Sequence, residues 1–129
     1  MLNEAVGMVR EFQKNAGQGY SQTPRMIPRE NVERRAKWIE DELQEFIQAK
    51  DIYEQADAIT DLLYYLIGAY VDAGIEPDPL FEIVHESNMK KIKAEIKKDS
   101  DGKVLKPEVW IHPDQGIRKV IDDQMMDRS

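Results

Sequence analysis

The sequence predicts an all-α protein: a compact bundle of four main helices followed by an irregular C-terminal arm. Two observations lead to this prediction. Apolar residues recur at steps of three and four along most of the chain, which is the spacing of one helix face. Proline and glycine interrupt the pattern at the places where helices would join. Because 129 residues are the usual length of one domain, we expect a single domain over 1–129, with a helical core at 1–98 and the arm at 99–129.

The first half of the chain contains two predicted helices. The first covers residues 2–16 and ends where Gly17 and Gly19 break the pattern. The second begins at about Arg29 and ends near Lys50. Its apolar face consists of residues spaced by alternating steps of four and three: Val32, Ala36, Ile39, Leu43 and Phe46. Only a very short connection separates this helix from the next one, so the two are expected to be antiparallel neighbours.

The third predicted helix runs from Ile52 to Ala73. It stops at Gly74, the residue type that tolerates a left-handed turn after a helix end. Apolar residues occupy most of its circumference, so we expect it to be largely buried. A fourth helix follows, with Asp78 placed to cap it and Pro79 at its first position.

The fourth helix is expected to extend toward Lys98. Beyond it, residues 99–102 read Asp-Ser-Asp-Gly, a strong turn signal. Residues 104–111 around Pro107 are typical of an extended segment, and a short final helix is predicted from Asp114 to about Met125. The arm is therefore expected to be mainly irregular.

Composition excludes several classes of protein. A net charge of −7 argues against a general nucleic-acid binder, which needs many Lys and Arg contacts to phosphate. The absence of cysteine excludes disulfides, thiolate metal sites and a cysteine nucleophile. The longest uncharged apolar stretch, residues 62–71, is half of the roughly 20 residues that a membrane helix needs. We therefore expect a cytoplasmic protein without a membrane segment or signal peptide.

Three acidic residues lie on one side of the third predicted helix. At 100° per residue, Glu54, Asp57 and Asp61 share a single stripe. Such a stripe is most often a solvated face held by nearby lysines. Here, however, no Lys or Arg occurs between Lys50 and Lys90. Like charges at this spacing repel one another, so another element, solvent or a cation has to compensate them.

The second predicted helix carries acids beside its apolar face. Glu42 and Glu45 are three residues apart and project along the seam with a neighbouring helix, whereas Asp41 and Glu40 point further around. In an antiparallel pair, both acidic stripes flank one groove, where Glu42 and Glu45 would meet Asp57 and Asp61. Without a cation, such a patch is costly, because nothing offsets its charge.

Hard oxygen ligands without cysteine or histidine favour Mg²⁺, with Mn²⁺ as the other candidate. Ions held there would bridge phosphate oxygens and lower the pKa of a bound water, which suits hydrolysis of a phosphoanhydride. Several carboxylates are needed because some neutralise metal while another accepts the proton of water. A Glu-x-x-Glu pair is a weak motif alone; the second acidic stripe on a helix without positive charge strengthens it.

Two segments give the chain a family resemblance. Residues 35–46 contain Arg-x-x-Trp-Ile-x-Asp-Glu-Leu-x-Glu-Phe, and residues 57–64 contain Asp-Ala-Ile-x-Asp-Leu-Leu-Tyr. Together with residues 85–91 and 101–107, they resemble the MazG-like, all-alpha NTP pyrophosphohydrolase superfamily, and most nearly its phosphoribosyl-ATP pyrophosphohydrolase-like branch. The resemblance implies a helical bundle of that type. It also implies cleavage of a nucleoside triphosphate between the α and β phosphates.

The resemblance also implies roles for acidic residues. Glu42 and Glu45 match the first acidic motif and Asp61 the last position of the second, so these three are the expected catalytic residues and metal ligands. Asp41 fills a position where relatives often have Glu. The chain departs from the pattern at Ala58, where a carboxylate is usual, and Asp57 or Glu54 is the candidate replacement.

Further residues follow from the resemblance as substrate-binding candidates. Asn88 and Lys91 share a helix face, and such a pair contacts phosphate or sugar in the family, although Lys91 is equally well read as a solvated lysine. Lys103 and Lys106 could reach phosphate across a subunit boundary. Aromatic candidates for base stacking are Trp38, Tyr65 and Trp110, although large aromatics are more often packing residues. Family members usually assemble, so we expect a homo-oligomer, most simply a dimer.

Two other functions compete with this hypothesis. Glu82-x-x-His85 matches the motif of di-iron carboxylate bundles, but the motif occurs once and His112 has no Glu three residues before it. The other is a non-catalytic helical module whose acidic face binds a basic protein. Turnover of a nucleotide distinguishes an enzyme from this module. The residues do not identify the base, the sugar or the biological role of the substrate.

Overall fold

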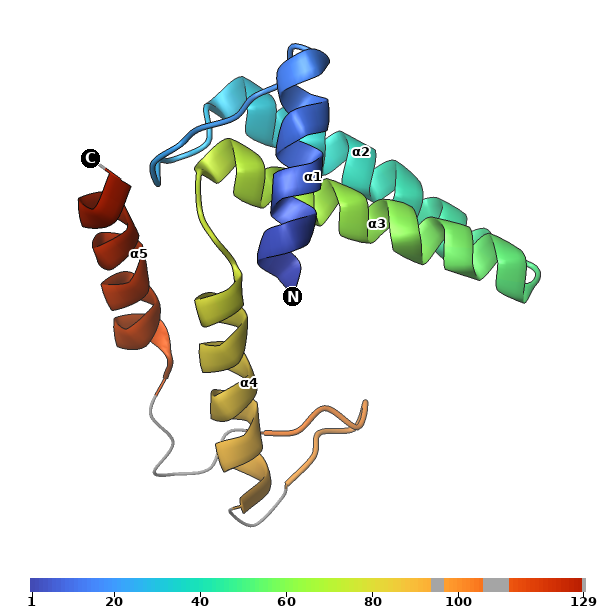
Figure 1. The fold of residues 1–129 in the computed structure, drawn as a ribbon. Helices are drawn as coiled ribbons and strands as arrows, with labels where there is room; N and C mark the ends of the chain where they lie inside the picture. Colours follow the sequence, from blue (N-terminus) through green and yellow to red (C-terminus); the bar gives the residue numbers. More distant parts are fainter. Residues whose placement is uncertain (94–96, 106–111, 129) are drawn as a thin grey trace.

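A computed structural model describes residues 1–93, 97–105 and 112–128 (Figure 1). Within these residues the chain is helical, and the only β pairing is an isolated antiparallel bridge between Lys98 and Val104. The elements are α1 (Leu2–Asn15), α2 (Arg29–Gln48), α3 (Ile52–Ala73), α4 (Asp78–Lys93) and α5 (Asp114–Arg128). The predicted all-α class is confirmed.

Helices α1, α2 and α3 form one packed unit. The antiparallel pair α2 and α3 projects as a long hairpin, and α1 crosses α3 near its second half (Figure 1). The apolar core cluster of this unit lies at the α1–α3 crossing and consists of four buried residues: Val6, Val9, Ile67 and Val71. The crossing therefore anchors one end of the hairpin, while its other end extends away from the rest of the chain.

The boundaries of α3 agree with the sequence prediction. Asp51 caps its start, because the Asp51 carboxylate accepts a hydrogen bond from the Glu54 amide at 2.8 Å. Gly74 ends it with φ at +68°, the left-handed conformation that favours glycine. These two ends place the acidic residues of α3 opposite those of α2.

Helix α4 leaves the hairpin in a different direction. The chain turns by 119° between α3 and residues 78–92, and α4 then packs against α5 (Figure 1). In a single chain, the fourth helix thus pairs with the C-terminal helix beyond the α1–α3 unit.

No single helix in the described residues is long and apolar enough to cross a bilayer; only α3 and α4 taken together meet that test, as a bent pair.

Asp78 was predicted to cap α4, but its side chain caps α1 instead. The Asp78 carboxylate accepts hydrogen bonds from the amides of Leu2 and Asn3, at 2.7 and 3.2 Å, so it caps the start of α1. In return, the Asn3 side chain accepts from the Asp78 amide at 3.1 Å. The two helices begin side by side, and each supplies a polar group to the other. Sequence spacing shows only the local helix and could not reveal this exchange.

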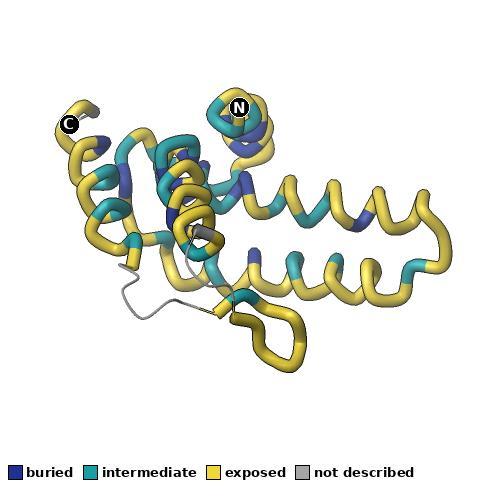
Figure 2. Tube along the Cα trace, turned by 90° about the horizontal axis from the view of Figure 1, so that it is seen from below, coloured by how far each residue is buried: buried dark blue, intermediate teal, exposed yellow. Residues whose placement is uncertain are grey.

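The prediction that α3 is largely buried is also wrong for a single chain. Only the side of α3 that meets α1 and α2 is covered, and much of the hairpin is exposed (Figure 2). Large apolar residues on its other side are between 48% and 71% exposed: Ile52, Ile59, Leu63 and Leu66. An exposed apolar surface of this kind commonly marks an interaction site.

The C-terminal region differs from the prediction at the ends of its two helices. Among the described residues, α4 covers Asp78–Lys93, and Lys98 is not part of it because Lys98 pairs with Val104. The predicted turn at 99–102 is present, with the Asp99 carboxylate accepting the amide of Asp101 at 2.9 Å. The final helix continues to Arg128, past the predicted end at Met125. About half of the arm is therefore helical. Helix α5 packs against α4, and its Gln124 binds Glu76 in the turn between α3 and α4.

Candidate functional site

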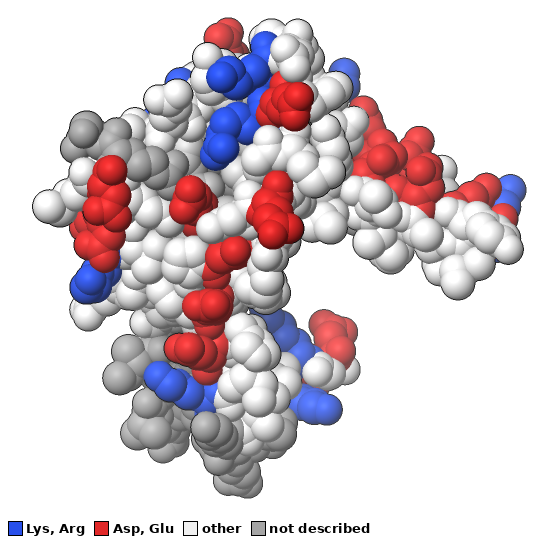
Figure 3. Space-filling model, viewed as in Figure 1, with Lys and Arg blue, Asp and Glu red and all other residues white. Residues whose placement is uncertain are grey.

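The candidate site lies along the groove between α2 and α3. Helical spacing places functional side chains in one stripe on each helix. The stripe of α2 carries Arg35, Trp38, Glu42 and Glu45, and that of α3 carries Asp57, Asp61, Tyr65 and Gly68. Because the helices are antiparallel, the acidic end of one stripe faces the acidic end of the other. Acidic side chains gather on this projecting end of the hairpin (Figure 3).

Three carboxylates converge at the centre of the groove. One oxygen each from Glu42, Glu45 and Asp61 lies within 4.8 Å of the others. Among the described residues, this is the only group of three or more Asp, Glu, His or Cys side chains that meets in this way. The structure thus brings together all three predicted catalytic residues. We call them the carboxylate cluster.

The cluster is electrostatically unfavourable by itself. Nearness of Glu45, whose carboxyl shares a hydrogen bond with Glu42 when one of them is protonated, raises the pKa of Glu42 to about 7. Partial burial and the charges of Asp61, Glu45 and Asp57 also contribute to this rise. Glu42 Oε2 is closed off from solvent and has no hydrogen-bond partner. A buried acceptor of this kind is normally paired, so the cluster has the character of a binding site.

The other predicted metal ligands lie around the cluster. Asp57 and Asp41 are exposed and outside the group of three, but the charge of Asp57 acts on Glu42 and that of Asp41 on Tyr65. Glu54 serves the helix start, because its carboxylate accepts the Lys50 amide at 2.7 Å. Ala58 stands where the family usually has a carboxylate. Of the two candidate replacements, Asp57 is the one whose charge acts on the site.

Aromatic residues border the cluster. Trp38 and Tyr65, both predicted to bind substrate, are half-buried and stacked, with ring centroids 5.6 Å apart and an interplanar angle of 28°. Burial raises the pKa of Tyr65, and the charges of Glu42, Asp61, Asp41 and Glu45 add to this effect. Its hydroxyl therefore stays protonated in the neutral range.

The predicted phosphate-binding residues are not at the cluster in this chain. Lys91 donates a hydrogen bond to Asn88 at 3.1 Å, and both are on α4, which departs from the hairpin. Lys106 and Trp110 lie outside the described residues. Sequence spacing pairs Asn88 with Lys91 correctly, but the direction of α4 depends on the turn at 74–77 and on α5.

Comparison with protein families agrees with the geometry. The sequence profile of the phosphoribosyl-ATP pyrophosphohydrolase family matches residues 9–88, more than half of the chain. The chain belongs to this family. The matched segment includes the whole α2–α3 hairpin and so every residue of the carboxylate cluster. No individual curated protein matches the chain.

Phosphoribosyl-ATP pyrophosphohydrolases are members of the MazG-like, all-alpha NTP pyrophosphohydrolase superfamily, so the predicted family is confirmed. Membership indicates a hydrolase of phosphoanhydride bonds acting on a nucleotide-type substrate. The family typically depends on a divalent metal, and the donors present fit one: three oxygen ligands converge, and one buried carboxylate oxygen lacks a partner.

The sequence did not reveal the residues that border the cluster on its α1 side. Phe12, Gln13 and Gln18 come from α1 and the connection after it, and they meet Arg35 and Trp38 at the groove. Of the residues at this side of the groove, only Arg35 had a signal in the sequence: it lies three residues before Trp38 and seven before Glu42, on the same helix stripe.

Proposed function

We propose that the protein is a divalent-metal-dependent nucleoside triphosphate pyrophosphohydrolase that cleaves between the α and β phosphates. Water and a nucleoside triphosphate would give a nucleoside monophosphate and pyrophosphate. The observation that carries this proposal is the convergence of Glu42, Glu45 and Asp61 on α2 and α3 without a positive side chain among them. A magnesium nucleotide supplies the charge that the cluster lacks.

The metal ligands we propose are Glu42, Glu45 and Asp61, with Asp57 and Asp41 as additional acidic groups beside them. Mg²⁺ or Mn²⁺ bound there would neutralise phosphate charge and make water more acidic. The protein's own contribution is to hold the carboxylates on two rigid helices. Their positions then require little rearrangement during the reaction.

We assign Glu42 as the group that accepts the proton of the attacking water. It is half-buried and lies between Glu45, Asp61 and the aromatic residues. As the proton moves to the carboxylate, the water oxygen bonds to phosphorus at the α–β anhydride. The bond from that phosphorus to the bridging oxygen breaks, and pyrophosphate leaves.

We also propose that the protein acts as a homodimer. A hollow of about 460 Å³ on the uncovered side of α3 is lined almost wholly by apolar groups, and it includes Leu63, Leu66 and Phe81. These three are 48%, 49% and 56% exposed. Sedimentation of the wild type should show dimers, and Leu66→Glu should give monomers. Wild-type monomers at micromolar concentration would contradict this.

The function is tested by pyrophosphate release from a panel of nucleoside and deoxynucleoside triphosphates. Release is expected with Mg²⁺ or Mn²⁺ and is expected to stop in EDTA. Product analysis should show the monophosphate and no orthophosphate. If no nucleotide is hydrolysed with either metal, the acidic surface is better explained as a docking face for a basic protein.

A further inference from the structure

Helix α2 carries two of the three carboxylates of the cluster, yet it has a single buried residue. Arg35 is 6% exposed, and every other residue of α2 is at least partly exposed. The apolar core cluster lies elsewhere, at the α1–α3 crossing. The most deeply buried contact that holds α2 against its neighbours is therefore made by a charged side chain.

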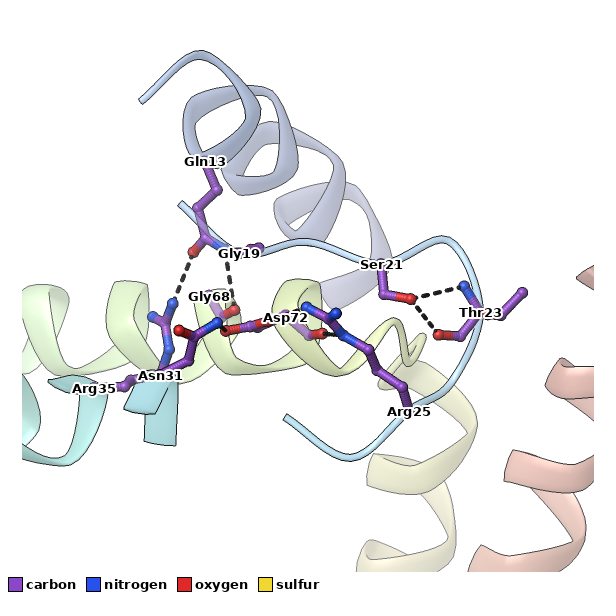
Figure 4. Close-up of polar contacts among 9 residues, drawn as sticks. All are labelled: Gln13, Gly19, Ser21, Thr23, Arg25, Asn31, Arg35, Gly68 and Asp72. Atoms are coloured by element: carbon purple, nitrogen blue, oxygen red, sulfur yellow. Dashed lines mark hydrogen bonds and ion pairs between the residues drawn. The ribbon is translucent and has the colours of Figure 1, made fainter. Parts of the chain in front are cut away.

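The guanidinium of Arg35 joins three helices. It donates a hydrogen bond from Nη1 to the carbonyl oxygen of Tyr65 on α3, at 3.1 Å. It donates another from Nη2 to Oε1 of Gln13 on α1, at 3.3 Å. Gln13 in turn donates to the carbonyl of Gly19 at 2.6 Å (Figure 4). One side chain of α2 thus holds both α1 and α3.

The backbone of α3 leaves room for this contact. Gly68 lies beside the guanidinium, and a Cβ at this position would stand 2.5 Å from Arg35 Nη1. The same Cβ would collide with the Gln13 side chain. Glycine is less favourable than alanine inside a helix, so α3 gives up some helix stability where Arg35 approaches it.

Fold stability alone does not explain a charged residue at this position. Burial lowers the pKa of Arg35, while the charge of Asp72 acts in the opposite direction. Arg35 Nε is closed off from solvent and has no hydrogen-bond partner. Apolar residues of similar volume often stabilise a fold as well as buried charged groups do, or better. A guanidinium adds direction, because its donors have a fixed geometry.

The contact between Arg35 and Tyr65 fixes how far α3 can slide along α2. Tyr65 is one helical turn after Asp61, and Arg35 is two turns before Glu42 on the same face. A slip of one residue would move Asp61 by about 1.5 Å relative to Glu42. Ligand distances at a metal site vary by only about 0.2 Å. The axial register of the two helices therefore decides whether the carboxylates can share a cation.

The cluster itself works against this register, because the ionised carboxylates of Glu42, Glu45 and Asp61 repel one another. A second hydrogen bond also joins α2 and α3, from Asn31 to Asp72 at 3.1 Å. It lies at the end of the hairpin that is further from the cluster. Of these two links between the helices, the one made by Arg35 is therefore the better placed to resist the repulsion.

We propose that Arg35 is a positioning residue for the metal site: through its contact with α3 it sets the spacing at which the carboxylate cluster binds a divalent cation. This inference rests on the proposed function, which assigns the cluster as the metal site. The charge of Arg35 by itself has the opposite effect, because a positive group disfavours a cation nearby. Register and charge therefore predict changes of opposite sign when the guanidinium is removed.

The test is the affinity of the folded protein for Mn²⁺ alone, measured by the electron paramagnetic resonance of the free ion. Arg35→Met keeps much of the side-chain volume and removes both hydrogen bonds. It should weaken Mn²⁺ binding about 10- to 100-fold, the range for groups that orient metal ligands. Arg34→Met removes the same charge from the neighbouring, exposed position. It should leave the affinity within about twofold, because water and salt screen surface charges.

A second variant acts on the other side of the contact. Gly68→Ala displaces the guanidinium without changing any charge, so it should also weaken Mn²⁺ binding about 10-fold or more. Gly7→Ala, where an added Cβ meets nothing within 4 Å, should bind like the wild type. Circular dichroism shows whether each variant folds. If neither Arg35→Met nor Gly68→Ala folds, Arg35→Lys decides: it keeps the charge, loses the fixed fork and should bind about 3- to 10-fold more weakly.

The outcomes separate three roles of Arg35. Weaker Mn²⁺ binding in the folded Arg35 and Gly68 variants supports the positioning role. A residue that only stabilises the fold would lower the urea midpoint and leave the Mn²⁺ affinity of the folded protein unchanged, which would overturn the inference. Tighter binding in Arg35→Met would also overturn it, because the charge alone would then explain the change.

The proposed function can fail separately from this inference. A wild type that binds Mn²⁺ with these differences among variants but hydrolyses no nucleotide would refute the enzyme and leave the role of Arg35 intact. Pyrophosphate release together with equal Mn²⁺ affinity in wild type and Arg35→Met would do the reverse. A wild type that binds no Mn²⁺ would overturn both.

Discussion

Helix α3 carries two aspartates with opposite surroundings. Asp61 and Asp72 lie three turns apart on nearly the same face. Asp72 is 1% exposed and completely paired: Arg25 donates to one oxygen at 2.6 Å and Asn31 to the other at 3.1 Å (Figure 4). Asp61 faces Glu42 and Glu45. The same residue type on one helix is thus part of the fold at one end and part of a binding site at the other.

The difference originates in the neighbouring elements. The connection between α1 and α2 passes the end of α3, where it supplies Arg25. Near Asp61, α3 faces α2 and the end of α1, and α2 presents Glu42 and Glu45 there. A carboxylate whose partners are built into the chain stabilises the folded state, whereas one that faces other carboxylates costs stability until a cation binds. This comparison yields predictions of decreasing size.

The largest effect should follow from neutralising the carboxylate cluster. Glu45→Gln and Asp61→Asn should each lower turnover by more than about 100-fold, because even groups that only support metal ligands contribute 10- to 100-fold. Circular dichroism should show an unchanged helical fold. Glu40→Gln, on an exposed part of the same helix, is the matched control and should retain activity. Substantial activity in both cluster variants would refute the assigned site.

Removing the paired aspartate should affect stability most. Asp72→Ala leaves the donors of Arg25 and Asn31 without their acceptor, at a cost of about 2 to 4 kcal/mol. Urea unfolding measures the loss, with Glu33→Gln as a control because Glu33 makes only an exposed ion pair. A loss below about 1 kcal/mol would mean that the Arg25–Asp72 pair contributes little to the fold.

A smaller effect is expected from pH in the metal-free protein. The pKa of Glu42 is raised to about 7 in the folded state, mainly by Glu45, while a carboxyl in the unfolded chain has its ordinary value near 4.3. Between these two values the folded state binds a proton that the unfolded state has lost. Stability in EDTA should therefore fall as pH rises through this window. The expected fall is about 1 to 2 kcal/mol, because solvent screens this partly exposed site.

Unfolding in EDTA at pH 5 and pH 7.5 measures this effect. Glu42→Gln should show a smaller difference between the two conditions than the wild type, since it removes the titrating group. Added Mg²⁺ should restore stability at pH 7.5, because a metal binds the deprotonated carboxylates. An equal pH dependence in Glu42→Gln and wild type would show that the cluster is not the source.

Much of the fold was predictable because its signals are local. The periodic apolar residues locate the helices, and Asp51 and Gly74 mark the ends of α3. The convergence of Glu42, Glu45 and Asp61 was also predictable, since it needs only helical spacing and one tight antiparallel connection. These features involve residues that are close in sequence or related by a single hairpin.

The remaining features depend on contacts between distant segments. Asp78 caps α1 rather than α4, and Arg25 reaches Asp72 across 47 positions. No periodic pattern records such pairs. The exposure of Leu63 and Leu66 was missed for a related reason: an apolar helix has the same sequence whether its cover comes from its own chain or from another molecule.

The C-terminal helix has a consequence beyond its own packing. Gln124 binds both backbone groups of Glu76, accepting from its amide at 2.9 Å and donating to its carbonyl at 3.0 Å. Glu76 lies in the turn that sets the direction of α4. A chain shortened before α5 would keep every carboxylate of the groove. It would lose the two hydrogen bonds between Gln124 and Glu76 that hold the direction of α4. Helix α5 lies outside the matched family segment, and through Gln124 it fixes the direction of α4, the helix that carries Lys90 and Lys91.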